Sequence, residues 1–383
     1  MTASLQELFP PNLWPIHQTD ELLSPQLVVF REHLRNNLDT MLRIAGPNAL
    51  QRLRPHCKTH KMSAIVKMQL DLGITKHKAA TMAEAEMLAQ SGVKDIVLAY
   101  TMIGPNVARA VKFRQVYPDV NFMVTVDTAE SLERLSGQIT EAGLTIGALV
   151  DVNPGRDRTG VRELEKVRDL YQRVYQAEGV TAAGFHMYDG HFHQSSPEER
   201  YAAVLPEWER IKGLRDELEA SGLAVPRIIC GGTPTFPVFA QFDDPALELS
   251  PGTCVFHDVG YGTKYPDLQD FRTAAVVFTR VVSRPTENRV TFDAGTKSIA
   301  SDPPIPERVY LPAIPDAQIV LHNEEHLVVE TSRANEYQPG DWVVALPRHV
   351  CPTSPMHKEA VVIENGEIVD RWPVTARDRQ LTI

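Results

Sequence analysis

The sequence predicts an α/β fold, in which an N-terminal (β/α)8 barrel is followed by a smaller, β-rich domain. Between residues 26 and about 265, short apolar runs alternate with longer segments of helical period. After residue 265 the long helical segments disappear, and strand-like runs are separated by prolines and glycines. A chain of 383 residues is long enough for both parts. We therefore expect a barrel domain at residues 26–265 and a β domain at residues 266–383, with residues 1–25 belonging to either.

Eight strands alternating with helices match the (β/α)8 barrel in number and in size. The alternative is an open doubly wound sheet, but no Gly-x-Gly-x-x-Gly sequence follows the first strand, which disfavours its dinucleotide-binding form. One helix is expected over residues 162–179, and another begins with Ser196 as its N-cap. The expected barrel strands are Leu53–Lys58, His77–Thr81, Ile96–Tyr100, Phe122–Asp127, Gly147–Val152, Ala182–Tyr188, Arg227–Cys230 and Leu247–Ser250. Those of the β domain are Val276–Val282, Arg289–Asp293, Ala317–Leu321, His326–Glu330, Trp342–Leu346, Glu359–Glu364 and Glu367–Trp372.

Composition excludes several classes of protein. The net charge of -10 argues against a general nucleic-acid binder and gives no reason to expect attraction to anionic membranes. No apolar run approaches the roughly 18 residues of a membrane span, and the N-terminus does not resemble a secretory signal, so we expect a cytoplasmic protein. The four cysteines are too few for a disulfide scaffold, and we expect reduced thiols.

A basic motif, Arg54–Lys61, lies at the end of the first expected barrel strand. Catalytic groups of this fold sit at the carboxyl ends of the strands. A lysine at this place, Lys58, would be partly desolvated, and the neighbouring cations His56 and Lys61 would lower its pKa and make it a usable amine nucleophile. The alternative is a solvated basic turn that leads into a helix.

Two glycine-threonine turns follow the seventh and eighth strands. They contain Gly232 and Thr233 in one, and Gly252 and Thr253 in the other. A phosphate in a (β/α)8 barrel typically binds at these two loops, where glycines let backbone N–H groups approach the oxygens and threonines add hydroxyl donors. Ordinary glycine turns are the alternative, but their joint placement favours a phosphate site.

Two further loops carry groups suited to binding and proton transfer. Arg156 and Arg158 follow the fifth strand and could contact a carboxylate or a cofactor oxygen, although a surface ion-pair loop would look the same. After the sixth strand, three histidines lie near Tyr188 and Asp189 and supply acid–base groups. Of these histidines, His186, His191 and His193, we expect the first to be packed and hydrogen-bonded without a chemical role.

A His-x-Cys pair, His349 and Cys351, lies in the expected β domain. On an extended segment both side chains share one side, and an imidazole with a thiolate suits zinc. Two ligands do not complete a site, so water, substrate or distant residues such as His326 or Asp293 would supply the rest. A packed histidine and cysteine are the alternative. Together these clusters predict a phosphate-bearing cofactor held by Lys58.

These segments resemble a known family. The motif Arg54–Lys61 is similar to the sequence Arg-Pro-His-x-Lys-Thr-His-Lys of the D-threonine aldolases and D-serine dehydratases, metal-activated members of the alanine-racemase-like enzymes that use pyridoxal 5'-phosphate (PLP). The resemblance spans nearly the whole chain in order, with further segments at Thr81–Glu86, Asp157–Gly160, Tyr188–His191, Pro251–Thr253, Asp293–Lys297, Glu324–His326 and His349–Thr353.

The resemblance implies a PLP-binding TIM barrel, a C-terminal β domain with the metal site, and a homodimer whose active sites lie at the subunit interface or the domain junction. Lys58 would bind PLP covalently, with His56 beside it, Arg158 and Tyr188 near the ring, and the phosphate at Gly232, Thr233, Gly252 and Thr253. Cys254 stands where many relatives have tyrosine, which puts one cofactor contact in doubt. His349 and Cys351 would bind the divalent metal; the thiolate favours zinc, with manganese or magnesium as alternatives.

The implied reaction is cleavage of a D-3-hydroxy amino acid into glycine, or a related amino acid, and an aldehyde, with His191 or His193 accepting the hydroxyl proton. The alternative is elimination by a D-serine-dehydratase-like enzyme to a 2-oxo acid and ammonia, in which Lys58 removes the α proton. A non-catalytic PLP-binding protein is less favoured, because it has no use for the β domain and its His349/Cys351 pair. An amino acid racemase likewise has no need of a metal.

Overall fold

The computed structural model describes residues 4–379 and 381–383, which separate into two units. The barrel unit contains Leu42–Lys58, Ser63–Gly252 and Asp378–Ile383. The β unit contains the remaining segments, Met1–Met41, Thr59–Met62 and Thr253–Arg377. The chain therefore passes from one unit to the other directly after Lys58 and directly after Gly252.

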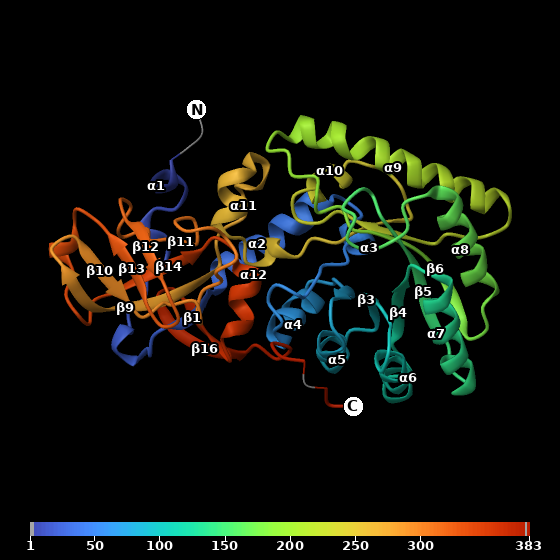
Figure 1. Ribbon diagram of the computed structural model, residues 1–383, viewed down its shortest axis with the longest axis horizontal. Helices are drawn as coiled ribbons and strands as arrows, with labels where there is room; N and C mark the ends of the chain where they lie inside the picture. Colours follow the sequence, from blue (N-terminus) through green and yellow to red (C-terminus); the bar gives the residue numbers. More distant parts are fainter. Residues whose placement is uncertain (1–3, 380) are drawn as a thin grey trace. The chain divides into compact units, whose positions relative to one another are not determined.

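The barrel unit is built on a parallel seven-stranded sheet in the order β2-β3-β4-β5-β6-β7-β8. Each strand pairs with the next one along the chain, and helices connect them on the outside, as Figure 1 shows. The strands are β2 (Lys76–Ala79), β3 (Asp95–Thr101), β4 (Asn121–Val126), β5 (Ile146–Val152), β6 (Val180–Met187), β7 (Ile228–Cys230) and β8 (Leu247–Leu249). The helices are α3 (Ala49–Arg52), α4 (Ser63–Asp71), α5 (Met82–Gln90), α6 (Asn106–Val116), α7 (Ala129–Glu141), α8 (Leu164–Gln176), α9 (Pro197–Ala220) and α10 (Phe236–Phe239).

The place of the first expected strand is taken by an irregular segment. Leu53 and His56 form single parallel bridges, with Leu249 of β8 and Lys78 of β2. The expectation of a regular strand at Leu53–Lys58 was therefore wrong, because Pro55 lacks the N–H group that a continuous ladder needs. The segment nonetheless joins the two edges of the sheet, and the predicted barrel is confirmed.

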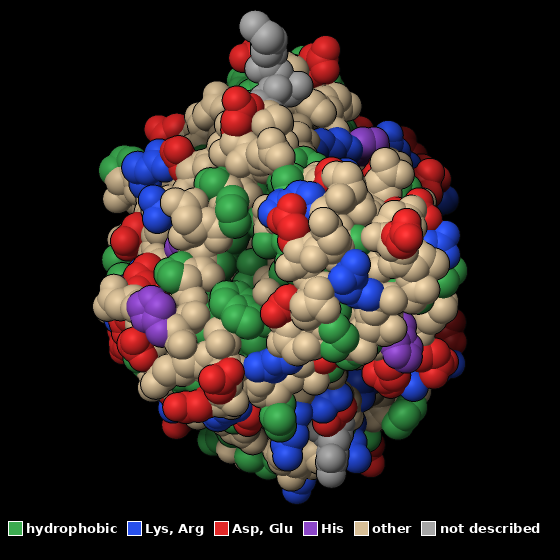
Figure 2. All heavy atoms as spheres, turned by 90° about the vertical axis from the view of Figure 1, so that its left-hand side faces the viewer, with side chains coloured by type: hydrophobic (Ala, Val, Ile, Leu, Met, Phe, Trp, Pro, Cys, Tyr) green, Lys and Arg blue, Asp and Glu red, His purple; other side chains and the backbone are tan. Residues whose placement is uncertain are grey.

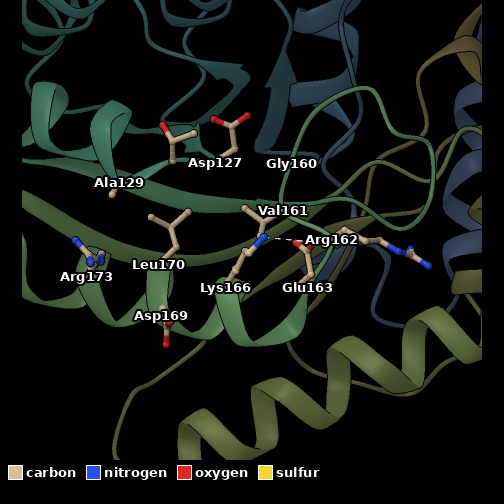
Figure 3. Close-up of a pocket in the computed structure, with 11 residues that line it drawn as sticks. Asp127, Ala129, Gly160, Val161, Arg162, Glu163, Lys166, Asp169, Leu170 and Arg173 are labelled. Carbon is tan, nitrogen blue, oxygen red and sulfur yellow. Dashed lines mark ion pairs between the residues drawn. The ribbon is translucent and has the colours of Figure 1, made fainter.

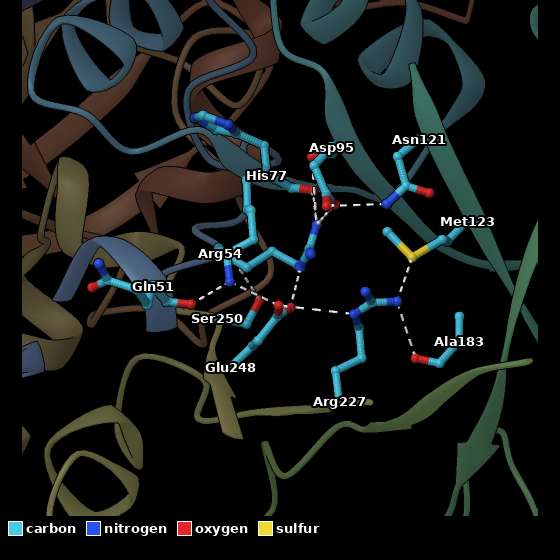
Figure 4. Close-up of polar contacts among 11 residues, drawn as sticks. Gln51, Arg54, His77, Asp95, Asn121, Met123, Ala183, Arg227, Glu248 and Ser250 are labelled. Atoms are coloured by element: carbon cyan, nitrogen blue, oxygen red, sulfur yellow. Dashed lines mark hydrogen bonds and ion pairs between the residues drawn. The ribbon is translucent and has the colours of Figure 1, made fainter. Parts of the chain in front are cut away.

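The interior of the barrel has a charged layer at the amino ends of the strands (Figure 4). Arg54 is fully buried there; its Nε lies 2.5 Å from Glu248 Oε2, and its Nη1 lies 2.6 Å from Asp95 Oδ1. Lys76 approaches the other oxygen of Glu248 at 2.8 Å. Paired charges can stay ionised in a dry interior. Arg54 of the basic motif therefore serves the closure of the barrel. Beside this network the barrel strands contribute a buried apolar cluster, Val97, Met123, Leu149, Ala183 and Ile229.

The β unit is built on a mixed nine-stranded sheet in the order β12-β13-β10-β9-β1-β15-β16, with β14 paired to β9 and to β11. Its strands are β1 (Gln26–Phe30), β9 (Ala275–Thr286), β10 (Arg289–Phe292), β11 (Val309–Tyr310), β12 (Gln318–His322), β13 (Leu327–Glu330), β14 (Trp342–Pro347), β15 (Glu359–Glu364) and β16 (Glu367–Pro373). Two of them, β1 and β11, were not expected. Its short helices are α1 (Leu5–Leu8), α11 (Val259–Lys264) and α12 (Val350–Thr353), while α2 (Arg31–Ala45) leads from this unit into the barrel unit.

Strand β1 lies in the middle of this sheet, parallel to β15 and antiparallel to β9. Its last four residues are buried because the sheet is covered on both faces. Phe278 and Val344 belong to one apolar cluster, and their neighbours Val277 and Val343 to another. The structure thus groups residues 26–30 with the β unit. The domain boundaries 26–265, for the PLP-binding barrel, and 266–383, for the β domain with the metal site, stay predictions.

Local signals in the sequence agree with the helices. The N-cap of α9 is Ser196, whose Oγ accepts a hydrogen bond from the Glu199 amide at 3.3 Å. In the described part of the chain, no helix combines the length and the apolar character of a membrane span. All four cysteines lie in the described part of the chain, and none of them forms a disulfide. On the face shown in Figure 2, acidic and basic side chains are interspersed around a central hydrophobic patch.

Candidate active site

The predicted cofactor lysine, Lys58, lies at the carboxyl-end edge of the barrel. Its backbone amide donates to His56 Nδ1 at 3.2 Å, and its Nζ is 5.6 Å from the centre of the Tyr188 ring. The guanidinium carbon of Arg158 is 4.2 Å from the centre of the same ring. Two cations therefore approach the same aromatic ring, an attractive arrangement. The structure brings together the four residues, His56, Lys58, Arg158 and Tyr188, that the resemblance assigns to the cofactor.

The two glycine-threonine turns also lie together. Gly252 N–H donates to Thr233 Oγ1 at 3.3 Å, which joins the loops after β7 and β8. Gly231 has a φ of 73°, a conformation that favours glycine. The Gly232 amide donates to a carboxylate oxygen of Asp189 at 3.1 Å. This backbone donor thus already faces an anionic oxygen, the kind of group that a phosphate presents.

Asp189 itself was not predicted to shape the phosphate loop. It is 1% exposed and also accepts a hydrogen bond from the hydroxyl of Thr235. The Asp189 carboxylate therefore occupies donors that a phosphate would need to share or displace. The Tyr188–His191 segment contained this residue, but nothing in its spacing indicated a contact 43 positions away.

The three histidines near β6 occupy different environments. His186 is buried and its Nδ1 lies 2.7 Å from Asp151 Oδ1, a packed, hydrogen-bonded arrangement as expected. His191 is half-buried, and burial lowers its pKa despite the opposing charge of Asp189. His193 is exposed, with Nδ1 in contact with the carbonyl of His191. Only His191 thus combines partial burial with a pKa lowered from its ordinary value.

The predicted metal ligands lie in the β unit. His349 Nδ1 is 2.5 Å from Asp302 Oδ2. Burial acts to lower the pKa of His349, but its hydrogen bond to Cys351, the charge of Cys351 and the hydrogen bond to Asp302 raise it to about 9. A carboxylate on one ring nitrogen fixes the orientation of a histidine whose other nitrogen binds a metal. Asp302, 47 positions from His349, was missed from the sequence.

Two threonine hydroxyls contact the Cys351 sulfur. Thr59 Oγ1 lies 3.1 Å from it and Thr253 Oγ1 lies 3.3 Å from it. Thr253 was predicted to bind phosphate, and the structure places it in the β unit beside Cys351. The next residue, Cys254, is fully buried in a short 3-10 helix. An imidazole and a hydroxyl-bonded sulfur are a donor set that fits a borderline-soft metal ion.

The further ligands suggested by the sequence lie elsewhere. Asp293 accepts hydrogen bonds from Thr279 Oγ1 at 2.6 Å and from the Arg280 amide at 3.0 Å. Its carboxylate thus already accepts hydrogen bonds from two residues of strand β9. Within residues 4–379 and 381–383, the structure records no contact of Asp293 or of the exposed His326 with the Cys351 sulfur.

A second group of potential metal donors lies beside Lys58. Ligand atoms of His56, Cys57 and Glu84 are all within 4.8 Å of one another, and the three residues are buried. These side chains already make hydrogen bonds within the protein. Glu84 accepts from the Ala80 amide at 2.6 Å and lies 3.6 Å from Cys57 Sγ. His56 accepts from the Lys58 amide. We therefore read them as a hydrogen-bonded support for the lysine loop and assign no metal to them.

A pocket of about 440 Å³ lies in the barrel unit between the loops after β4 and β5 and helix α8 (Figure 3). Charges of both signs line it, including the ion pair of Lys166 with Glu163 at 3.4 Å. None of the residues predicted to bind the cofactor lines this pocket. It is therefore separate from the cluster around Lys58.

Known proteins resemble this chain over its length. A family model described as alanine racemase, N-terminal domain, matches residues 29–258, and one described as a putative serine dehydratase domain matches residues 274–363. The chain is 30% identical to a D-threonine aldolase of an Arthrobacter species over 96% of both proteins. It is 28% identical to a 3-hydroxy-D-aspartate aldolase of Paracoccus denitrificans (strain Pd 1222), over 94% of this chain and 93% of that one. The crystal structure of a D-threonine aldolase from Filomicrobium marinum has a TM-score of 0.86 and 27% identity, covering 96% of this chain and 99% of that one.

The fold and the cluster around Lys58 thus define a barrel enzyme of the PLP-dependent type. The chain belongs to the alanine-racemase-like family, whose model covers more than half of its residues. Within this family it is a lyase, since the relatives that match nearly all of it include aldolases and a D-serine dehydratase.

Proposed function

We propose that this protein is a PLP- and divalent-metal-dependent lyase that splits D-3-hydroxy amino acids, as a D-threonine aldolase does, into glycine or a related amino acid and an aldehyde. One observation carries the proposal: the threonines on the Cys351 sulfur are the residues that directly follow Lys58 and Gly252. Cys351 of the predicted metal pair therefore contacts the residue that directly follows each of two segments predicted to hold the cofactor.

Bound PLP would supply an electron sink for the electron pair of the broken bond. The chain's own groups orient it. The Lys58 amine would be the point of attachment, and Arg158 and Tyr188, which lie together beside it, would contact the ring. Gly232 and Gly252 turn backbone N–H groups toward oxygen acceptors in the structure, which supports phosphate binding there.

The proton of the substrate hydroxyl needs an acceptor. His191 suits this role, because a lowered pKa keeps its imidazole neutral at physiological pH and able to take a proton. His193 is the alternative, and its exposure makes it a less selective base. The proposal therefore assigns the hydroxyl proton to His191.

His349 and Cys351 would hold the metal, which would lower the pKa of the substrate hydroxyl. Sulfur as a ligand favours zinc, with manganese or magnesium as alternatives. Asp302 would keep the His349 ring in a fixed orientation. The Thr59 and Thr253 hydroxyls would hold the sulfur in place.

Elimination to a 2-oxo acid and ammonia is the second candidate. It is favoured by the serine-dehydratase model at residues 274–363, the part of the chain that contains His349 and Cys351. Elimination requires Lys58 to remove the α proton and gives His191 no necessary role. A non-catalytic PLP-binding protein would need neither the metal pair nor Asp302.

A product assay distinguishes these functions. The protein is loaded with PLP, stripped of metal with a chelator, and given zinc, manganese or magnesium before a panel of D-3-hydroxy amino acids, with the L-enantiomers as controls. We expect glycine and an aldehyde by NMR. A 2-oxo acid with ammonia would replace the aldolase by the dehydratase. No turnover of any D-substrate, despite a bound cofactor that the Lys58→Ala variant lacks, would leave only a binding protein.

We also propose a homodimer in the cytoplasm that takes small D-amino acids as substrates. The lack of a disulfide among the four described cysteines is consistent with a reducing compartment. Sedimentation equilibrium measures the mass of the assembly in solution, and a monomer of 42.8 kDa at assay concentration would contradict the dimer.

A further inference from the structure

A second lysine lies inside the barrel next to the predicted cofactor lysine. Lys78 belongs to β2, and its amide donates to the Pro55 carbonyl at 2.9 Å, while the Cys57 amide donates to the Lys78 carbonyl at 3.0 Å. Lys58 is the residue after Cys57. The two lysines therefore stand on adjacent segments at the same edge of the barrel.

The alternation of β2 places the Lys78 side chain in the interior. Lys76, two residues earlier, reaches Glu248 of the buried charged layer, with 2.8 Å between Nζ and Oε1. Side chains two positions apart in a strand share a face, so Lys78 points inward, nearer to the carboxyl-end mouth. It is only 4% exposed.

The surroundings of Lys78 disfavour the charged form of its side chain. Burial, and then the positive charge of Lys58, lower the pKa of Lys78 to about 7, although the charges of Asp189, Cys230 and Asp151 act in the opposite direction. The ammonium group is thus close to losing its proton at neutral pH. The charge of Lys58 thus reaches Lys78 across the interior.

The nearby carboxylates hold other donors. Asp151 accepts from His186 Nδ1 at 2.7 Å, and Asp189 accepts from the Gly232 amide at 3.1 Å. Among the residues that the structure describes, no hydrogen bond or ion pair engages the ammonium of Lys78. An amine without a close counter-charge in a poorly solvated site acts strongly on its neighbours.

We propose that Lys78 is a positioning residue: a cationic neighbour that sets, from inside the barrel, the proton affinity of the nitrogen of Lys58. This inference rests on the proposed function, because it requires the cofactor at Lys58. Two like charges close together in such a site do not both stay protonated at neutral pH, and a lysine becomes a usable nucleophile when a cation beside it lowers its pKa. The Tyr188 ring, 5.6 Å from the Lys58 Nζ, also lies under the Arg158 guanidinium, and His56 accepts from the Lys58 amide.

The test follows the visible absorption of the PLP-loaded protein as a function of pH, without substrate. Removing a positive neighbour favours the protonated form of the Lys58 nitrogen, so Lys78→Met should raise the pH midpoint of the spectral change by about one unit or more. Lys78→Arg keeps the charge and should leave the midpoint at or below that of the wild type. Lys76→Met removes the same charge from the same face of β2, farther from Lys58, and should move the midpoint much less.

Equal midpoints in all four proteins would overturn the role of Lys78, as would a Lys78→Arg variant that behaves like Lys78→Met. Circular dichroism shows whether each variant is folded, and Lys78→Gln replaces Lys78→Met if the latter is not. A wild-type protein without any PLP-dependent band would overturn the proposed function and this inference together. A normal band with an unmoved midpoint would overturn this inference alone.

Discussion

The hydroxyl oxygen of Thr59 lies 3.1 Å from the sulfur of Cys351, although 292 positions separate the two residues. Thr59 follows the predicted cofactor lysine directly, and Cys351 belongs to the predicted metal pair. The motif around Lys58 thus has two functions: Arg54 closes the barrel, and Thr59 holds a group of the β unit.

This contact predicts that Thr59→Val weakens metal binding without loss of the cofactor. Valine keeps the shape of the side chain but removes the hydroxyl from the sulfur, and losing an outer partner of a ligand costs roughly tenfold or more in metal affinity. Titration of the chelated protein with zinc measures the change. Thr59→Ser keeps the hydroxyl and serves as the matched control; an affinity equal to that of the wild type in both variants would contradict the prediction.

Asp302→Asn should reduce metal affinity by roughly 10- to 100-fold, because the carboxylate orients His349 through its Nδ1. The visible band of the cofactor should be unchanged, since Lys58 belongs to the other unit. Competition with a chromogenic chelator measures the affinity. Asp316→Asn, a change of the same kind at a carboxylate bonded to Ser332, is the control. Equal losses in both variants would point to general destabilisation.

His191→Asn should lower kcat by roughly 100- to 10,000-fold, the range for loss of a general base. His193→Asn should have a much smaller effect. Because burial lowers the pKa of His191, its imidazole loses basicity only below the ordinary histidine range. The acidic limb of the wild-type rate profile should therefore lie below about pH 6.5. An acidic limb above that value, or a larger loss in the His193 variant, would assign the proton to another group.

Arg54→Met should destabilise the protein by about 3–5 kcal/mol, because it leaves the buried carboxylate of Glu248 with one partner fewer. Urea unfolding, followed by circular dichroism, measures the free energy of unfolding. The exposed pair of Arg134 with Glu130 offers the control, since Arg134→Met should change that free energy by at most about 1 kcal/mol. Similar values for the two variants would mean that the charged layer does not hold the barrel closed.

The sequence by itself determined the elements and the chemical groups. Alternating apolar and helical segments located all seven regular barrel strands to within one or two residues, because burial on a strand imposes a pattern on neighbouring positions. The residues around Lys58 were found because they occur in one local motif. The loops of Arg158 and Tyr188 were found because each follows a strand.

Only the tertiary structure decided the rest. The position of strand β1 in the sheet could not be predicted from the sequence, because its partners β9 and β15 lie about 250 and 330 residues further along the chain. Asp302 and Lys78 carry ordinary side chains in ordinary sequence contexts, and they matter through what lies beside them: His349 for the first, and the dry interior near Lys58 for the second. Local pattern encodes periodicity and side-chain chemistry, whereas the field and the hydrogen bonds at a site depend on contacts between distant segments, which exist only once the chain is folded.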